Sequence, residues 1–121
     1  MINKKTLILG ASPNPDRYGY KATVMLKEHG FDVIPFGLRS GKIGDTEIIT
    51  NLPEAEDIDT VTLYVGPQNQ QSYIDYVITL KPKRVIFNPG TENEAFEASL
   101  KIAGIQPVEA CTLVMLQTGQ Y

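Results

Sequence analysis

The sequence contains one cysteine, Cys111, and one histidine, His29, in 121 residues. A lone cysteine cannot form an internal disulfide, which agrees with a reducing compartment. One cysteine and one histidine are also too few for a typical zinc site, so we expect no metal centre. His29 precedes Gly30 at the expected end of a helix, where an imidazole bonds the last carbonyls, so we interpret it as structural.

Long apolar runs and an excess of positive charge are also lacking. The stretch from Leu7 to Leu9 is far too short for a signal-peptide core or a membrane span. The formal net charge is −3 and the isoelectric point is about 5.1, which disfavours a protein that binds duplex nucleic acid. We therefore expect a cytoplasmic protein with neither nucleic acid nor membrane as its partner.

The composition is that of an ordinary globular domain. Hydrophobic residues make up 42% of the chain and charged residues 21%, without a low-complexity tract. This length suits one domain, so we predict a single domain over residues 1–121.

Apolar runs alternate with helical patterns along the chain. The runs at 5–10, 31–36, 60–65, 84–90 and 106–109 predict strands, and the patterns at 18–29, 73–80 and 92–104 predict helices. Residues 37–59 predict a loop with at most a short edge strand at 47–50, and 113–116 can add a short helix. Pro35 predicts that the second strand finishes at a sheet edge or lacks its last hydrogen bond. This alternation predicts an α/β fold: a three-layer, Rossmann-like arrangement with a mostly parallel sheet of about five strands flanked by helices.

In such sheets a ligand binds beyond the carboxyl ends of the strands, where the strand order reverses. This brings together the loops at 10–18, 37–44 and 65–70. The first loop, in GASPNPDRYGYKA, leads into a helix N-terminus that favours phosphate, with Gly10 allowing close approach, Ser12 as a hydroxyl donor and Arg17 as a cation. Arg39 and Lys42 add cations from the second loop. We predict a ligand that carries several phosphates.

Two common nucleotide-binding patterns are missing. Gly10 is followed by Ala11 and Ser12 rather than by the glycine of G-x-G-x-x-G, and no Walker lysine pattern occurs. The second strand ends in Pro35-Phe36-Gly37, without the acidic residue that would bind the ribose of NAD. Nicotinamide chemistry is therefore not the first choice.

The chain resembles the small stand-alone CoA-binding proteins related to the N-terminal domain of the succinyl-CoA synthetase alpha subunit. The similarity lies in GASPNPDRYGYKA, in YVGP at 64–67 and in the region of Cys111. It implies CoA or acyl-CoA as the ligand. The residues it implicates, together with Gly10 and Ala11 of the same first loop, are Ser12, Pro13, Arg17, Tyr18, Arg39, Lys42, Val65, Gly66 and Pro67. The synthetase's phosphorylated histidine belongs to a further domain, so that chemistry does not carry over.

Several of these residues also have ordinary structural interpretations. Arg17 could pair with Asp16 or Glu28, Arg39 and Lys42 could simply be solvated, and Ser12 could cap a turn. Cys111 is flanked by apolar residues and is more often a packing residue than a reactive thiol.

The leading hypothesis is therefore a CoA-binding protein that holds the nucleotide end of its ligand, with no evident catalytic residues. The alternatives are an acyl-transfer or redox enzyme that uses Cys111, and an NAD(P)- or nucleotide-binding regulatory module. A homo-oligomer or a protein partner also stays open.

Overall fold

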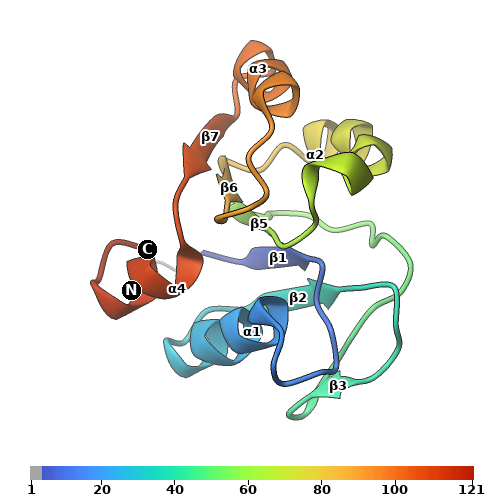
Figure 1. Ribbon diagram of the computed structural model, residues 1–121, viewed down its shortest axis with the longest axis vertical. Helices are drawn as coiled ribbons and strands as arrows, with labels where there is room; N and C mark the ends of the chain where they lie inside the picture. The colour runs from blue at the N-terminus through green and yellow to red at the C-terminus, as the bar shows by residue number, and fades with distance from the viewer. Residues whose placement is uncertain (1–3) are drawn as a thin grey trace.

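The computed structural model describes residues 4–121 of the chain; residues 1–3 of the expected domain lie outside this range. Its centre is a five-stranded sheet in which every neighbouring pair is parallel. Across the sheet the strands follow the order β2 (Val33–Phe36), β1 (Thr6–Leu9), β5 (Thr60–Leu63), β6 (Arg84–Phe87) and β7 (Gln106–Glu109) (Figure 1). The order reverses between β1 and β5, as the predicted Rossmann-like topology requires.

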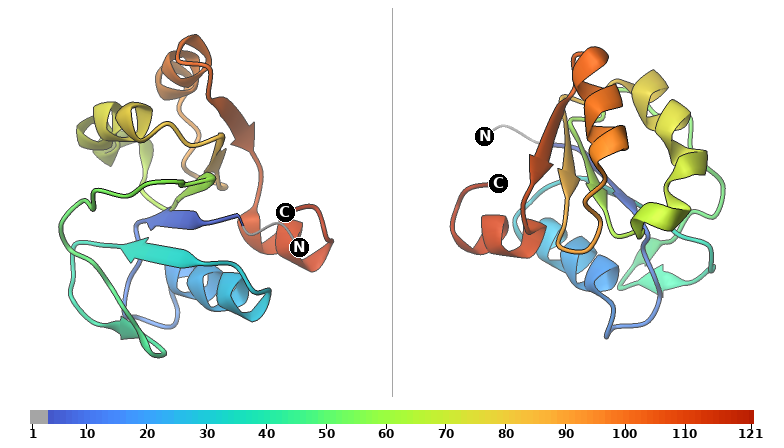
Figure 2. Two further views of the ribbon diagram at one scale, coloured as in Figure 1. Left: turned by 180° about the vertical axis from the view of Figure 1, so that it is seen from behind. Right: turned by 45° about the horizontal axis from the view of Figure 1, so that its top comes forward.

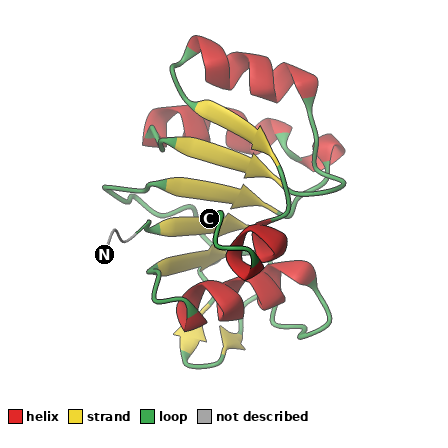
Figure 3. Cartoon of the chain, turned by 90° about the vertical axis from the view of Figure 1, so that its left-hand side faces the viewer, coloured by secondary structure: helices red, strands yellow, loops and turns green. Residues whose placement is uncertain are grey.

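Helices cover both faces of this sheet, which confirms the predicted three-layer α/β fold (Figures 2 and 3). Side chains of a strand alternate between faces, so Leu7 and Leu9 pack on one side and Ile8 on the other. The first side is covered by α2 (Ile74–Leu80) and α3 (Glu94–Ile102), and the second by α1 (Tyr18–Glu28) and α4 (Thr112–Gln117). Within residues 4–121 no helix is long and apolar enough to cross a bilayer.

The helix ends follow the sequence signals. After α1, His29 Nδ1 lies 2.8 Å from the Met25 carbonyl oxygen, and Gly30 takes a φ of 84°, in the left-handed region. At the start of α3, Asn93 Oδ1 accepts a hydrogen bond from the Phe96 amide at 3.2 Å. The structural interpretation of His29 thus agrees with its contact at the helix end.

The structure differs from the predictions in two connecting segments. Residues 37–59 contain a short antiparallel hairpin, β3 (Lys42–Ile43) and β4 (Thr46–Glu47), in place of a single strand at 47–50. Ile49 forms an isolated parallel bridge to Phe36, the last residue of the edge strand β2. The sequence does not predict this hairpin, because strands of two residues have no room for the apolar alternation that marks a strand. Before α2, the chain makes two 3₁₀ turns, η1 (Pro67–Asn69) and η2 (Gln71–Tyr73).

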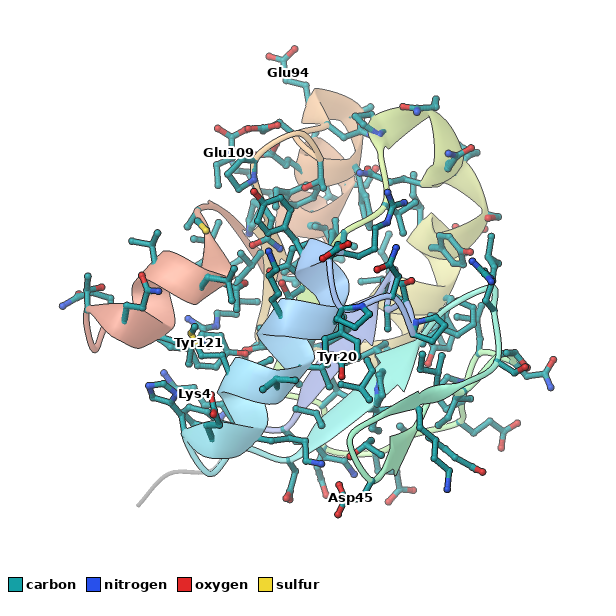
Figure 4. All side chains as sticks on the ribbon, turned by 60° about the horizontal axis from the view of Figure 1, so that its bottom comes forward. Lys4, Tyr20, Asp45, Glu94, Glu109 and Tyr121 are labelled. Carbon is teal, nitrogen blue, oxygen red and sulfur yellow. The ribbon has the colours of Figure 1, made fainter. Side chains whose placement is uncertain are left out.

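The last residue, Tyr121, packs across the amino ends of the central strands. Its hydroxyl hydrogen bonds with Thr6 Oγ1, and its ring lies 5.1 Å from the Phe31 ring and 4.4 Å from the Arg84 guanidinium carbon. Lys4 Nζ, beside Tyr121 in Figure 4, donates to the Tyr121 carbonyl oxygen. One end of the sheet is therefore closed by side chains.

Candidate functional site

A cavity of about 1060 Å³ lies at the opposite end, beyond the carboxyl ends of the strands. Small-molecule sites are typically about 300–1,000 Å³. Its lining residues come from four stretches of chain, each at or after the end of a different strand: 10–19 at β1, 36–39 at β2, 64–73 at β5 and 89–91 at β6. The three loops that the sequence brings together do meet here, and a fourth loop joins them.

The floor of this cavity is made of closely packed main chain. A Cβ on Gly37 would lie 2.1 Å from the Ala11 carbonyl oxygen, and one on Gly19 would lie 2.5 Å from the Gly10 oxygen. Gly10 has a φ of 104°, and a Cβ there would lie 2.7 Å from the Tyr64 oxygen. Real Cβ atoms essentially never come this close, so only glycine allows the first three loops to touch.

Amides of the first loop are used within the protein. Gly10 and Ala11 both donate to the Phe36 carbonyl oxygen, at 3.0 and 2.8 Å. Their amides therefore join β1 to β2, a use that the sequence argument for free amides in this loop missed. Ser12 Oγ accepts from the Asn14 amide at 3.1 Å, so Ser12 caps a turn.

The N-terminus of α1 has no side-chain cap. Arg17 is the N-cap residue, makes no side-chain capping bond, and no acidic residue lies in the first turn. The amides of Tyr18, Gly19 and Tyr20 have no partner within the helix by α-helical geometry. By contrast, α3 is capped by Asn93 and has Glu94 and Glu97 in its first turn. Of these two helices, α1 is therefore the one whose N-terminus can bind an anionic group of a ligand.

The charged residues that line the cavity are Asp16, Arg17 and Arg39, all on the first two loops. Within residues 4–121 the Arg17 and Arg39 side chains form no ion pair, so the pairing of Arg17 with Asp16 or Glu28 is not observed. Both guanidinium groups are exposed, and each can bind two oxygens of a phosphate at once.

The remaining walls are uncharged. Tyr73 packs edge-on against Phe36 with 5.8 Å between ring centroids. Burial raises the pKa of the Tyr64 phenol further above neutral pH, so this wall carries no charge. At the rim Leu38 is 83% exposed and Tyr18 is 65% exposed, with Lys21 Nζ 5.2 Å from the Tyr18 ring centroid. Exposed apolar groups beside cations suit a ligand with a flat base and phosphates.

The sequence-predicted residues fall into two groups. The structure brings eight of them to the cavity lining: Gly10, Ala11, Ser12, Arg17, Tyr18, Arg39, Val65 and Gly66. Three others are not among the lining residues. Pro13 packs against Gly41, Lys42 is exposed on β3, and Pro67 begins η1.

Sequence reasoning missed the fourth loop, with Pro89, Gly90 and Thr91. Its signal was present, because Asn88-Pro89-Gly90 follows a buried strand, and neighbouring parallel strands end at the same edge. Gly37 and Gly19 were missed because their role depends on long-range contacts.

Cys111 lies outside the cavity lining, half-buried as the N-cap residue of α4. The adjoining residue, Thr112, takes part in a buried network. Asn88 Nδ2 donates to Thr62 Oγ1 at 2.6 Å and to the Leu63 oxygen at 2.8 Å, while its Oδ1 accepts from the Thr112 amide at 2.8 Å. This network ties β5 and β6 to the start of α4, the helix that Cys111 precedes.

Comparison with protein families shows to which family the chain belongs. The family model described as CoA binding domain matches residues 4–117. The chain belongs to the CoA binding domain family. Membership supports a role in CoA binding and confirms the resemblance seen in the sequence.

Solved structures with the same fold include other proteins without a stated function. One, described as an uncharacterized protein, is 54% identical, with a TM-score of 0.97 and all of both chains covered. A protein from Thermus thermophilus is 25% identical (TM-score 0.82; 98% of this chain and 91% of that one). A hypothetical protein from Pyrococcus horikoshii is 27% identical (TM-score 0.83; 96% and 82%). No curated protein matches this CoA binding domain chain.

Proposed function

We propose that this protein is a cytoplasmic CoA-binding protein that holds the nucleotide and phosphate end of CoA or an acyl-CoA at the carboxyl ends of β1 and β2. The observation that carries the proposal is the unequal distribution of charge around the cavity. Two cations, Arg17 and Arg39, one acid, Asp16, and the uncapped N-terminus of α1 belong to the first two loops, and uncharged loops form the rest. CoA has the same asymmetry, because its phosphates lie at one end and its long thiol arm is neutral.

The residues that follow β2 favour CoA over NAD as the ligand. In proteins that bind NAD, an acidic side chain near this strand end bonds the ribose hydroxyls, whereas an arginine accommodates a ribose phosphate. Here the strand is followed by Gly37, Leu38 and Arg39, all at the cavity. Arg39 suits the 3′-phosphate of CoA, and it would equally suit the 2′-phosphate of NADP, so NADP is the informative competitor.

Binding without catalysis is the simpler form of this proposal. The candidate nucleophile of the enzyme hypothesis, Cys111, is half-buried and outside the cavity lining. The lining residues themselves supply no cysteine thiol that could attack a ligand's thioester. We therefore assign Cys111 to packing and make no reaction step depend on it.

Calorimetric titration with CoA, acetyl-CoA, NADP, NAD and ADP tests the proposal. We expect saturable binding of CoA and acetyl-CoA with similar affinities, because the thiol end is not the charged end, and weaker binding of NADP, NAD and ADP. A preference for NADP over CoA, or no heat with any of these ligands at millimolar concentration, would contradict it.

The substitution Arg17→Ala should weaken CoA binding about tenfold to a hundredfold, because it removes charge-assisted hydrogen bonds to phosphate. The free energy of unfolding should change little, since the Arg17 side chain forms no ion pair within the described residues. Calorimetry and urea unfolding of the same preparation measure the two effects. Equal affinities for the wild type and the variant would remove Arg17 from the site.

A further inference from the structure

A buried amide joins the two uncharged loops of the cavity. Gln70 lies between η1 and η2 and is 0% exposed. Its Nε2 donates to the Val65 carbonyl oxygen and to the Thr91 carbonyl oxygen, both at 2.8 Å. Its Oε1 accepts from Asn93 Nδ2 at 2.9 Å. Two carbonyl partners require donors, so this network fixes which end of the amide carries nitrogen.

Both carbonyl partners belong to residues that line the cavity. Val65 follows β5, and Thr91 follows β6, so Gln70 connects loops from different strands. Gln70 itself does not line the cavity. Replacing Gln70 by an apolar residue would take the donor from the buried Thr91 carbonyl and the partly buried Val65 carbonyl, and the cost of an unpaired carbonyl favours movement of these loops. Gln70 thus sets the distance between two walls without touching what lies between them.

We propose that Gln70 is a positioning residue for the neutral, thiol-bearing arm of the ligand. This inference rests on the proposed CoA-binding function and extends it to the uncharged part of the cavity. The arm contains amide groups and no charge, and the walls held by Gln70 offer it Asn69, Ser72 and main-chain groups. The nucleotide end, by contrast, faces Arg17 and Arg39, which Gln70 does not contact.

The test compares two ligands on one variant. Gln70→Met keeps the length of the side chain and removes all three hydrogen bonds. CoA should bind this variant about tenfold more weakly, the equivalent of one lost hydrogen bond to the arm. Adenosine 3′,5′-bisphosphate, which has the base, ribose and phosphates without the arm, should bind it within about twofold of the wild type.

A second variant keeps the test decisive where Gln70→Met does not fold. Asn93→Asp retains the oxygen that caps α3 but places a carboxylate against Gln70 Oε1. Repulsion between the two oxygens replaces the hydrogen bond from residue 93 and pushes the Gln70 side chain, which weakens its hold on Val65 and Thr91. This variant should also lose affinity for CoA, several-fold, and keep its affinity for adenosine 3′,5′-bisphosphate.

Tyr76→Phe is the matched control. It removes a hydrogen bond of 2.6 Å from the Tyr76 hydroxyl to the Pro53 carbonyl oxygen, and neither residue lines the cavity. It should lower stability and leave the affinities for both ligands unchanged.

The outcomes separate the inference from the function on which it rests. Selective loss of CoA affinity in Gln70→Met or Asn93→Asp supports the positioning role. If the variants lose both ligands equally, or lose neither, the positioning role is overturned while CoA binding stands. If the wild type binds neither ligand, the proposed function fails and the positioning role falls with it.

Discussion

Arg39 and Lys42 follow the same strand in the sequence, but the structure separates them. Arg39 lines the cavity, whereas Lys42 lies on β3 and is not among the lining residues. Arg39→Ala should therefore weaken CoA binding about tenfold, and Lys42→Ala by less than about twofold. Titration of both variants at low and at moderate salt checks this, because loss of a phosphate contact also reduces the salt dependence. Equal losses would return Lys42 to the binding set.

At the same scale, Gln70 shows what a sequence pattern conceals. It stands in the polar stretch GPQNQQ, which predicts a turn and a helix start. Gln70 is nevertheless 0% exposed, while Gln68 and Gln71 are exposed. Only the arrival of Thr91 and Asn93 from a distant loop gives its amide three partners. A buried glutamine can be identified only when those partners are known.

At the scale of elements, the loops after β1 and β2 are held together by Gly37. A Cβ on this residue would lie 2.1 Å from the Ala11 carbonyl oxygen, so Gly37→Ala must push the two loops apart. We expect a loss of about 1–3 kcal/mol in the free energy of unfolding, together with weaker CoA binding. Urea unfolding and calorimetry of the variant measure both.

Gly44→Ala is the appropriate comparison for Gly37→Ala. Gly44 has a φ of 62° in the turn between β3 and β4, and a Cβ there would meet no atom within 4 Å. Its cost is conformational, about 1–2 kcal/mol, and it should leave the affinity for CoA unchanged. A matching loss of affinity in both variants would show that the contact between Gly37 and Ala11 does not shape the site.

The packing of α3 against β7 makes the free energy of unfolding depend on pH. Burial, and then the hydrogen bond and repulsion from Glu109, raise the pKa of Glu97 above its ordinary value of 4.5. A carboxyl whose pKa is higher in the folded state stabilises the fold at low pH, and this contribution is lost as pH rises through the raised pKa. Glu97→Gln should therefore be more stable than the wild type at pH 7 and equal to it at about pH 4.

The measurement is the urea midpoint of wild type and Glu97→Gln at both pH values. Glu94→Gln serves as the control, because Glu94 is an exposed acid in the first turn of the same helix and favours the helix dipole. That control should be slightly less stable than the wild type at pH 7. A Glu97→Gln variant that is destabilised at pH 7 would show that the bond from the Asn93 amide outweighs the repulsion from Glu109.

At the scale of the whole molecule, the sequence predicted most of the fold and part of the site. Buried strands such as Thr60–Leu63 and the stop signal at Gly30 are local, so the element order and the parallel sheet followed from them. The cavity also followed, because it lies where parallel strands end. The glycine contacts, the fourth loop and the position of Lys42 did not, because they depend on which distant backbone packs against which.

The two ends of the sheet have opposite characters. At the amino ends, Tyr121 packs against Phe31 and Arg84 and bonds with Thr6, while the carboxyl ends surround the cavity. Changes at Tyr121 should therefore act on stability alone. Tyr121→Phe should lower the free energy of unfolding by about 1 kcal/mol through the lost hydrogen bond, and the affinity for CoA should not change. A variant with normal stability but altered affinity would contradict this division.

A cavity floor built of main chain has an evolutionary consequence. Gly10, Gly19 and Gly37 lie against the main chain of Tyr64, Gly10 and Ala11, so a larger residue at any of the three positions would push the loops apart and be selected against. The rim is different, since Leu38 and Arg39 are exposed and support no part of the core. Descendants of one such protein could therefore diverge toward different phosphorylated ligands by rim substitutions alone, while inheriting the same floor intact.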